Sequence, residues 1–397
     1  MSSIKIPVSI EIPAETETPL SVYKKLANQP YSYLLESVEG GEKWARYSVI
    51  GLPSKTIIKV SGENVSLVHN NNVIESIQTS DPLQYIEDYR EQIQVEFNED
   101  LPKFIGGLVG YFSYDCIRYI EPKLKEQEPS DPLGTPDALF MVSEEVAIFD
   151  NVDNKLHLIV LSESNLSRDI NIAKTRLDKI LDSLKKDIPK NEGIKSQEPI
   201  SESDFVSSFG KKDFEKSVEI IKEYIRSGDV MQVVCSQRLS APFKEDPIDL
   251  YTSVRGLNPS PYLYCLNLKD FHIVGSSPEI LARLEDGEIT VRPIAGTRRR
   301  GKDSKDDIAM ELEMINDPKE LAEHLMLIDL GRNDIGKVAE IGSVEVTRKF
   351  YVERYSHVMH MVSNVKAKVR KGLKAMDVFR ATFPAGTLSG APKIRAM

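Results

Sequence analysis

The chain has 397 residues, of which 41% are hydrophobic and 28% are charged, and this balance is typical of a globular protein with a sizeable core. Its net charge of −10 argues against general nucleic-acid binding, which requires a basic surface. No stretch reaches membrane-spanning length, and the N-terminus lacks the basic and apolar pattern of a secretion signal. The three cysteines are widely separated and odd in number, so they predict neither a disulfide framework nor a zinc site and favour a cytoplasmic location.

Composition divides the chain into four regions. Residues 1–20 are polar and are expected to be a loose lead-in, and residues 21–186 contain alternating strand and helix patterns. Residues 187–210 are rich in charge, proline and glycine, which predicts a linker, and residues 211–397 form the second patterned region.

The first patterned region reads as strands with three helices. Apolar periodicity of the helical kind predicts helices at residues 21–28, 82–94 and 166–186. Alternating or continuous apolar runs predict strands at 31–37, 46–51, 55–60, 64–69, 106–115, 138–150 and 155–161.

In the second region, a helix with its apolar side at Phe214, Val218, Ile221 and Ile225 is predicted to end before Gly228. The alternation in 230–240 then predicts a strand. One side would present Gln232 and its polar neighbours to a cleft or to solvent, and the other would be buried. Further strands are predicted at 262–264, 343–349 and 354–363, with a helix at 376–383 and a loop at 384–393.

A hairpin is predicted over residues 280–293, because Asp286-Gly287 between alternating residues is typical of a type I′ turn. Glu279 precedes the hairpin, and Gly296 and Thr297 follow it with Arg298, Arg299 and Arg300. A carboxyl, a glycine, a hydroxyl and guanidiniums would suit a small dianionic substrate. A surface hairpin with a solvated basic end fits the spacing equally well.

Residues 318–330 are predicted to form a helix with Asp317 as N-cap and Pro318 at its first position. Glu320 and Glu323 lie three residues apart and are therefore neighbours on its surface. Such acids either complement the helix dipole or bind Mg²⁺, which needs few protein carboxylates.

Four strings in the sequence resemble those of the chorismate-utilising enzymes, among which are component I of anthranilate synthase and of aminodeoxychorismate synthase and the isochorismate and salicylate synthases. They are SSPE ending at Glu279, PIAGTRRRG from Pro293, KELAEHLMLIDLGRND from Lys319 and PAGTLSGAPK from Pro384. The resemblance implies an α+β fold of two packed antiparallel β-sheets with helices outside.

Site roles follow from the same resemblance. It implies that Glu279, Gln232 and His360 are catalytic and that Gly296 and Thr297 bind chorismate. The family's Mg²⁺ ligand falls on Glu323. A buried carboxyl beside another acid has a raised pKa, which would suit Glu279 as a general acid.

Two further strings resemble the tryptophan feedback site of anthranilate synthase component I. In LLES the implied contact is Ser37, and in NPSPY and the residue after it the implied contacts are Pro261, Tyr262 and Leu263. On local grounds alone Ser37 would be a turn residue at a strand end.

Ala295 and Gln232 favour the anthranilate-forming members, which use ammonia, over those with lysine at these positions. The resemblance then implies a chain that converts chorismate and ammonia to anthranilate and pyruvate, the first step of tryptophan biosynthesis, with L-tryptophan as inhibitor. Ammonia would come from a glutamine amidotransferase subunit, component II. The alternatives are aminodeoxychorismate synthase component I and a non-catalytic tryptophan-binding protein.

Two departures from the family stand out. Arg299 occupies a usual proline position. Family members also continue past the residue matching Met397 with a tyrosine, an arginine and a second metal-binding glutamate, so the 397-residue chain is expected to have low activity.

Overall fold

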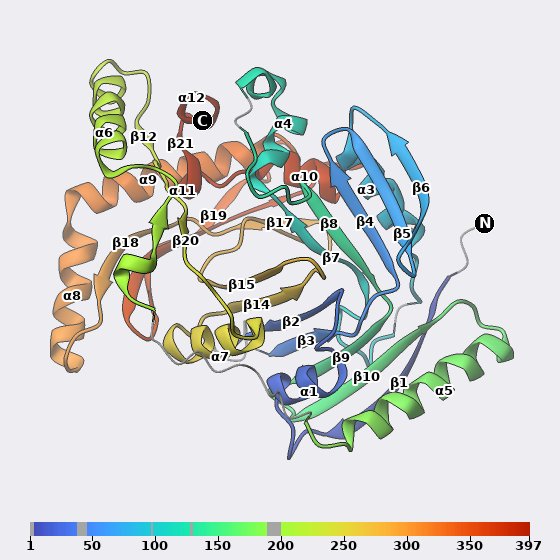
Figure 1. Ribbon diagram of the computed structural model, residues 1–397. Helices are drawn as coiled ribbons and strands as arrows, with labels where there is room; N and C mark the ends of the chain where they lie inside the picture. Colours follow the sequence, from blue (N-terminus) through green and yellow to red (C-terminus); the bar gives the residue numbers. More distant parts are fainter. Residues whose placement is uncertain (1–3, 38–45, 97, 128–129, 189–199) are drawn as a thin grey trace. The chain divides into compact units, whose positions relative to one another are not determined.

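The structure is a computed structural model that describes residues 4–37, 46–96, 98–127, 130–188 and 200–397 (Figure 1). The chain forms two compact units. Unit 1 contains residues 1–119, 129–192 and 247–278, and unit 2 contains residues 120–128, 193–246 and 279–397. Residues 189–199 of the predicted linker at 187–210 lie outside the described residues, and the predicted four-region division stays a prediction.

Unit 1 contains a seven-stranded antiparallel sheet with the order β1-β10-β9-β3-β2-β14-β15. Its strands are β1 (Ile6–Pro13), β2 (Ser32–Glu36), β3 (Tyr47–Gly51), β9 (Glu145–Asp150), β10 (Lys155–Ser162), β14 (Tyr262–Asn267) and β15 (His272–Ser277). Strand β1 lies where a loose lead-in was expected, and all eight of its residues pair with β10. Its isoleucines and valine alternate with polar residues, which is a half-buried strand pattern.

A second, five-stranded antiparallel sheet packs on the first through a shared apolar core. Its strands are β4 (Thr56–Ser61), β5 (Asn64–His69), β6 (Asn72–Gln78), β7 (Gly107–Phe112) and β8 (Ala138–Ser143). Side chains from both sheets meet in this core, including Tyr33 and Leu266 from the first sheet and Ile57 and Met141 from the second. This is the predicted arrangement of two packed sheets.

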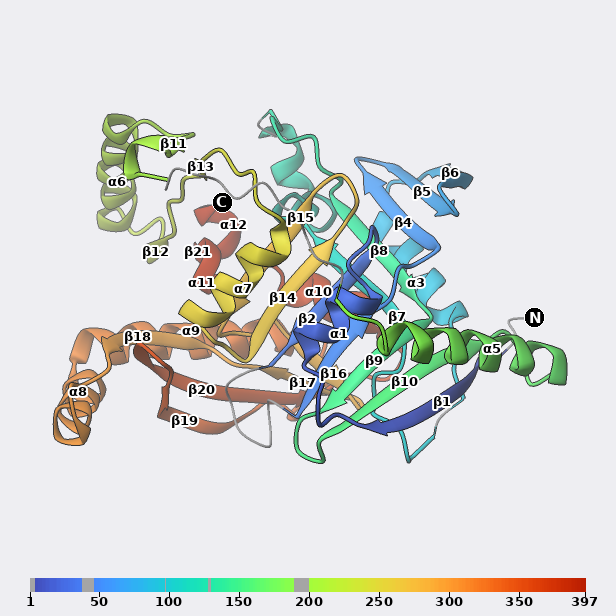
Figure 2. The ribbon, with the colours of Figure 1, turned by 60° about the horizontal axis from the view of Figure 1, so that its bottom comes forward.

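Helices cover the other face of the seven-stranded sheet (Figure 2). They are α1 (Pro19–Leu26), α5 (Ser167–Leu184) and α7 (Pro247–Leu257), whose buried residues join one core with β2, β9, β10 and β14. The spacing of the apolar residues Ile170, Ala173, Leu177, Ile180 and Leu184 predicts one apolar side for α5, and the last four of these are buried. Another helix of unit 1, α3 (Pro82–Gln92), begins at the N-cap Asp81.

Unit 2 is built on its own antiparallel sheet, in which the long strand β20 is central. Strands β17 and β18 both pair with β20, β16 extends β17, and β19 also pairs with β20. The bounds are β16 (Arg283–Glu285), β17 (Glu288–Val291), β18 (Ile294–Arg299), β19 (Glu345–Arg354) and β20 (Val358–Lys368).

Helices α8 (Ser304–Asn316), α9 (Pro318–Gly336) and α10 (Ala375–Thr382) accompany this sheet, and its core joins residues of β17, β20, α9 and α10. The hairpin prediction is confirmed, because Asp286 and Gly287 have φ of 51° and 75°. The helix caps are also confirmed, since Asp317 accepts from the backbone N–H groups of Lys319 and Glu320.

Two predictions for unit 2 were wrong. The expected strand at 230–240 is reduced to β12 (Gln232–Val233) and β13 (Leu239–Ser240), and its supposedly buried Met231 and Leu239 are exposed. The loop at 384–393 contains a short helix, α11 (Gly386–Ser389), the strand β21 (Gly390–Ala391) and the start of α12 (Lys393–Ala396). The helix predicted to end before Gly228 is confirmed as α6 (Lys211–Arg226), although none of its residues is buried.

Two short pairings complete unit 2. Strand β12 pairs with β21, and β11 (Val206–Ser207) pairs with β13. Within the described residues, no helix is long and apolar enough to cross a membrane.

Candidate active site and inhibitor site

Gly296 forms a β-bulge in β18. The pairing register with β20 shifts between Ala295 and Thr297, and Gly296 itself has a φ of +65°, a conformation that glycine adopts without strain. A Cβ at this position would lie 3.3 Å from Glu320 Oε2, so the absent side chain lets the backbone approach helix α9. The bulge turns the glycine-threonine backbone out of the regular ladder.

His360 on β20 contacts both residues of this bulge. Its Nδ1 lies 3.1 Å from Thr297 Oγ1 and 3.2 Å from the Gly296 carbonyl oxygen. Because a carbonyl only accepts, Nδ1 carries the proton and Nε2 is the unprotonated nitrogen of the neutral ring. Burial lowers the pKa of His360, which keeps the ring neutral near pH 7. His360 can therefore act as a base through Nε2.

Glu279 is a carboxyl group held in a mostly buried position. Burial raises its pKa to about 7, and the Thr387 hydroxyl, whose Oγ1 donates to Oε2 at 3.4 Å, partly offsets this shift. Of the two expected causes, burial and a neighbouring acid, it is burial that raises this pKa. Glu279 also lines a cavity of about 40 Å³, which has room for about one or two water molecules. Such a carboxyl can donate a proton near neutral pH.

Glu323 lies one turn after Glu320 on α9, and Gln232 Nε2 lies 3.5 Å from Glu323 Oε1. The Gln232 Oε1 atom is buried and has no hydrogen-bond partner among the described residues. An unsatisfied buried amide oxygen near a carboxylate can bind a cation that prefers oxygen ligands, or an amine. No group of three or more His, Cys, Asp or Glu side chains in the described part of the chain is arranged to hold a metal. The pair therefore fits Mg²⁺ with water or substrate ligands, not an all-protein cage.

The six predicted catalytic, substrate and metal residues all lie in unit 2 and are linked by contacts. Thr387 contacts Glu279. Shortly after Thr387 the chain reaches Gly390-Ala391, where the backbone of Ala391 pairs with that of Gln232. Gln232 in turn reaches Glu323.

The remaining contacts run along α9 to the bulge. Glu320, one turn before Glu323, lies beside Gly296, and Gly296 bonds to His360. The structure thus places the predicted residues along one path of contacts.

The basic residues after the bulge do not behave as expected for a substrate clamp. Arg298 is bound by three carboxylates, from Glu313, Asp317 and Glu320, at 3.0, 3.2 and 3.0 Å. Arg300 pairs with Asp307, and Arg299 is exposed. Neither the contact of Arg298 with Glu320 nor that of Thr387 with Glu279 was predicted from the sequence. Spacing could not reveal either one, because each partner is far along the chain.

The residues predicted to contact tryptophan lie together in unit 1. Ser37 follows β2 directly, and its neighbour Glu36 pairs with Leu263 on β14. Pro261 and Leu263 are buried, and Tyr262 has a buried hydroxyl with no hydrogen-bond partner in the described ranges. The adjacent ends of β2 and β14 therefore offer a polar atom that a ligand could satisfy.

Helix α7 fixes this corner through Glu36, which is 4% exposed. Arg255 donates to both Glu36 oxygens at 2.7 and 2.8 Å, and the Tyr251 hydroxyl donates at 2.7 Å. Two charge-assisted bonds and a third donor satisfy a carboxylate that would otherwise be costly to bury. Tyr251 and Arg255 are four residues apart and therefore share a helix face. This spacing does not indicate that their common partner is Glu36.

Comparison with known proteins agrees with the sequence resemblance. The family described as chorismate binding enzyme matches residues 10–397. Anthranilate synthase component 1 of Pseudomonas putida is 53% identical over 394 residues, covering 99% of this chain and 80% of that protein. The Aquifex aeolicus protein of the same name is 43% identical, covering 99% of this chain and 79% of that protein.

Solved structures also match. The crystal structure of anthranilate synthase component I from Streptococcus pneumoniae has a TM-score of 0.77 and 35% identity, covering 97% of this chain and 82% of that one. The menaquinone-specific isochorismate synthase of Escherichia coli, at 15% identity, has a TM-score of 0.66 over 99% of this chain and 78% of that chain, which shows a shared fold. The chain therefore belongs to the chorismate-binding enzymes and, within them, to the anthranilate synthase component 1 proteins.

Proposed function

We propose that this chain converts chorismate and ammonia to anthranilate and pyruvate, using the residues of unit 2 described above. The supporting observation is the buried carboxyl of Glu279, whose raised pKa of about 7 keeps a substantial fraction of it protonated at neutral pH and available as an acid. Ammonia adds to the chorismate ring as the C4 hydroxyl leaves, and Glu279 gives its proton to that hydroxyl, which departs as water.

The bulge and His360 act on the other part of the substrate. Gly296 and Thr297 bind the chorismate ring from the strand β18, where the backbone is turned out of the ladder. Pyruvate elimination forms an aromatic ring and requires loss of a ring proton. His360 is the proposed base, because its proton on Nδ1 is engaged by the Gly296 carbonyl and leaves Nε2 to accept.

Glu323 is the proposed protein carboxylate for Mg²⁺, with the Gln232 amide oxygen as a second oxygen donor. Bound there, Mg²⁺ would neutralise the charge of the substrate carboxylate. Gln232 Nε2 faces Glu323, so the amide oxygen would share Mg²⁺ with Glu323 only after the amide is turned, whereas the unturned oxygen suits orientation of incoming ammonia.

Component 2 is the proposed source of ammonia, since the name "component 1" of the relatives implies a second component as partner. Cys116 and Cys265 are buried, and burial raises the pKa of the Cys116 thiol to about 12, which makes it a poor nucleophile for glutamine hydrolysis. The free cysteines also support a reducing, cytoplasmic location.

L-Tryptophan is the proposed feedback inhibitor, held by Ser37 and by Pro261–Leu263. The buried Tyr262 hydroxyl supports this assignment, because it has no partner in the part of the chain that is described. By linkage, tryptophan must bind an inactive form more tightly in order to inhibit.

The test is anthranilate fluorescence with chorismate, ammonium and Mg²⁺, together with calorimetric titration of chorismate into the chain. We expect chorismate to bind in the presence of Mg²⁺, with weaker binding in Glu323→Gln, and anthranilate as the product. A lack of chorismate binding by the folded chain would contradict the proposal. Aminodeoxychorismate as the product would instead identify the related enzyme, which the alanine at 295 argues against.

A further inference from the structure

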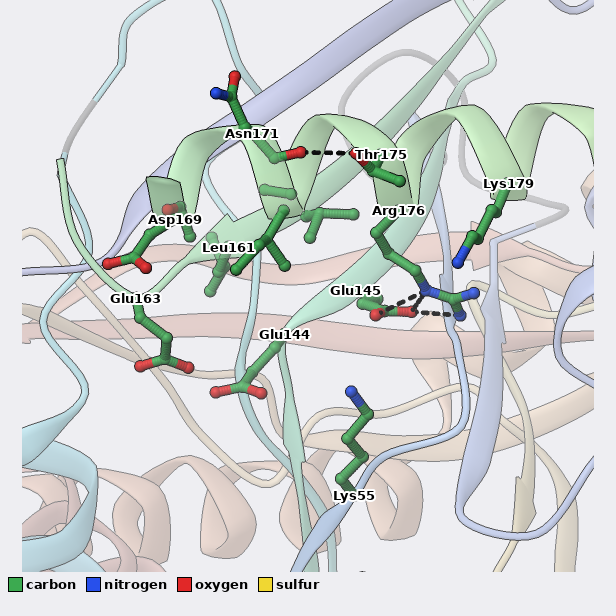
Figure 3. A pocket seen from close by; sticks show the side chains of 14 residues that line it. Lys55, Glu144, Glu145, Leu161, Glu163, Asp169, Asn171, Thr175, Arg176 and Lys179 are labelled. Atoms are coloured by element: carbon green, nitrogen blue, oxygen red, sulfur yellow. Dashed lines mark hydrogen bonds and ion pairs between the residues drawn. The ribbon is translucent and has the colours of Figure 1, made fainter. Parts of the chain in front are cut away.

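A large cavity in unit 1 has no role in the proposed reaction. It has a volume of about 550 Å³ and lies between the first half of α5 and the adjoining ends of β9 and β10 (Figure 3). This volume falls within the usual range of about 300–1,000 Å³ for small-molecule sites. None of the residues assigned to the catalytic or tryptophan sites lines it.

Three of the four acidic side chains that line the cavity are paired with cations. Lys5 pairs with Glu144 at 2.5 Å and with Glu163 at 2.9 Å. Arg176 binds Glu145 through three contacts of 2.7 to 2.9 Å, drawn as dashed lines in Figure 3. The charge of Arg176 offsets that of Glu145, whereas Lys5 offsets only one of its two carboxylates, so one negative charge remains beside Lys5.

Two lysines remain without a partner. Lys55 and Lys179 line the cavity, and neither amino group forms an ion pair or hydrogen bond with any residue that the structure describes. In Figure 3 the amino group of Lys55 points up toward the Arg176–Glu145 pair, and that of Lys179 points down toward it. Asp169, at the opposite end of the view, accepts from the Ser164 hydroxyl at 2.5 Å. One end of the cavity is therefore cationic.

The remaining wall is apolar. Val160 and Leu161 are each 6% exposed and form the floor, whereas Ile172 is 59% exposed at the edge of the same cavity. A cavity that is lined by a large exposed isoleucine and by two unpaired ammonium groups suits a ligand with an apolar body and an anionic end.

From this arrangement we infer that the cavity is a second small-molecule site, which binds a compact organic anion with one or two carboxylates on an apolar ring. The carboxylates contact Lys55 and Lys179, and the ring covers Leu161 and Ile172. Because the lysines are exposed to solvent, binding weakens as salt screens their charge.

The experiment is calorimetric titration of phthalate, an aromatic dicarboxylate, into the full chain and its variants. We expect phthalate to bind at least ten-fold more weakly to the Lys55→Gln/Lys179→Gln double variant than to the wild type. Lys174→Gln is the matched control, because this lysine is exposed on α5 but does not line the cavity. Comparing variants removes any contribution from phthalate bound at the chorismate site.

Two further arms test the chemistry. Thr175→Trp places an indole in the cavity from an exposed position of α5 and should abolish the lysine-dependent binding. Benzamide, which lacks charge, and inorganic phosphate, which lacks a ring, should not compete with phthalate. Equal binding to wild type and double variant, or equal competition by either compound, would overturn the inference. Neither result depends on whether the chain makes anthranilate.

Discussion

At the scale of single residues, Glu279 combines a proposed chemical role with a cost in stability. Its pKa is raised by burial from 4.5 to about 7, so the folded state binds more protons than the unfolded state between these values. Stability therefore falls as pH rises through this window, and the penalty above pH 7 is at most about 3 kcal/mol.

We predict that Glu279→Gln separates the two effects. The variant should lose about 10²–10⁴-fold in the rate of anthranilate formation, because it has no proton to donate. It should also be more stable than the wild type at pH 8 and similar to it at pH 4.5, since an amide is not ionised. Urea denaturation at the two pH values measures the second effect. A variant that is inactive and also less stable at pH 8 would indicate a structural role.

A second residue-scale prediction concerns Arg255, which holds the buried Glu36 beside the proposed tryptophan site. Arg255→Gln leaves a buried carboxylate with fewer donors, and we expect a loss of about 3–5 kcal/mol in stability at neutral pH. Tryptophan affinity, measured by calorimetry, should fall because the β2–β14 corner loses its anchor.

The conservative partner change is Tyr251→Phe, which removes one neutral donor to the same carboxylate. We expect a smaller loss of stability, about 1 kcal/mol, and a smaller loss of tryptophan affinity. Chorismate affinity should be unchanged in both variants. Unchanged tryptophan binding in a folded Arg255→Gln protein would show that α7 does not position this site.

At the scale of elements, the bulge in β18 and the short helix α11 set the geometry of the proposed active site. We predict that Gly296→Ala lowers stability by about 1–2 kcal/mol, because alanine is strained at a φ of +65°. It should also weaken chorismate binding, since the new methyl group would press on Glu320.

Gly287→Ala is the matched control, because Gly287 has a φ of +75° but open space around its Cα. We expect a similar stability loss without a change in chorismate affinity, both measured as for Gly296→Ala. If the two alanine variants bound chorismate equally well, the close approach at the bulge would have no functional role.

Helix α11 contributes through Thr387, whose hydrogen bond lowers the pKa of Glu279 against the effect of burial. We predict that Thr387→Val raises this pKa further, so that the fall in rate at high pH moves to a higher pH than in the wild type. The pH dependence of kcat/KM, expressed per concentration of free ammonia, measures this shift. Thr387→Ser should keep the wild-type profile, and a shift to lower pH in Thr387→Val would contradict the assignment.

Several elements were predictable from the sequence and others were not. The Asp286-Gly287 turn, the capped start of α9 and the buried side of α5 depend on interactions within a few residues, and each was predicted correctly. Strand β1 was missed because its isoleucines look unremarkable until β10, far along the chain, supplies a partner. The prediction of one strand at 230–240 was wrong because no long partner strand lies beside this alternating segment, which makes only two short pairings.

At the scale of the whole molecule, the chain supplies the chorismate-binding part of a two-component reaction. We predict that ammonium supports anthranilate formation by the chain alone, whereas glutamine does so only after addition of component 2. The buried thiols of Cys116 and Cys265 are unsuited to glutamine hydrolysis. Anthranilate fluorescence with each nitrogen source measures the difference, and glutamine-dependent product from the chain alone would refute it.

The sequence by itself determined the family, the local turns and caps, and the residue types needed for the proposed chemistry, because motifs and short-range propensities are properties of neighbouring residues. Only the tertiary structure decided which of these residues meet and what their surroundings do to them. Burial raises the pKa of Glu279, three carboxylates occupy Arg298, and Arg255 reaches a carboxylate 219 positions away. These outcomes depend on desolvation and long-range contact, and neither is encoded in the spacing along the chain.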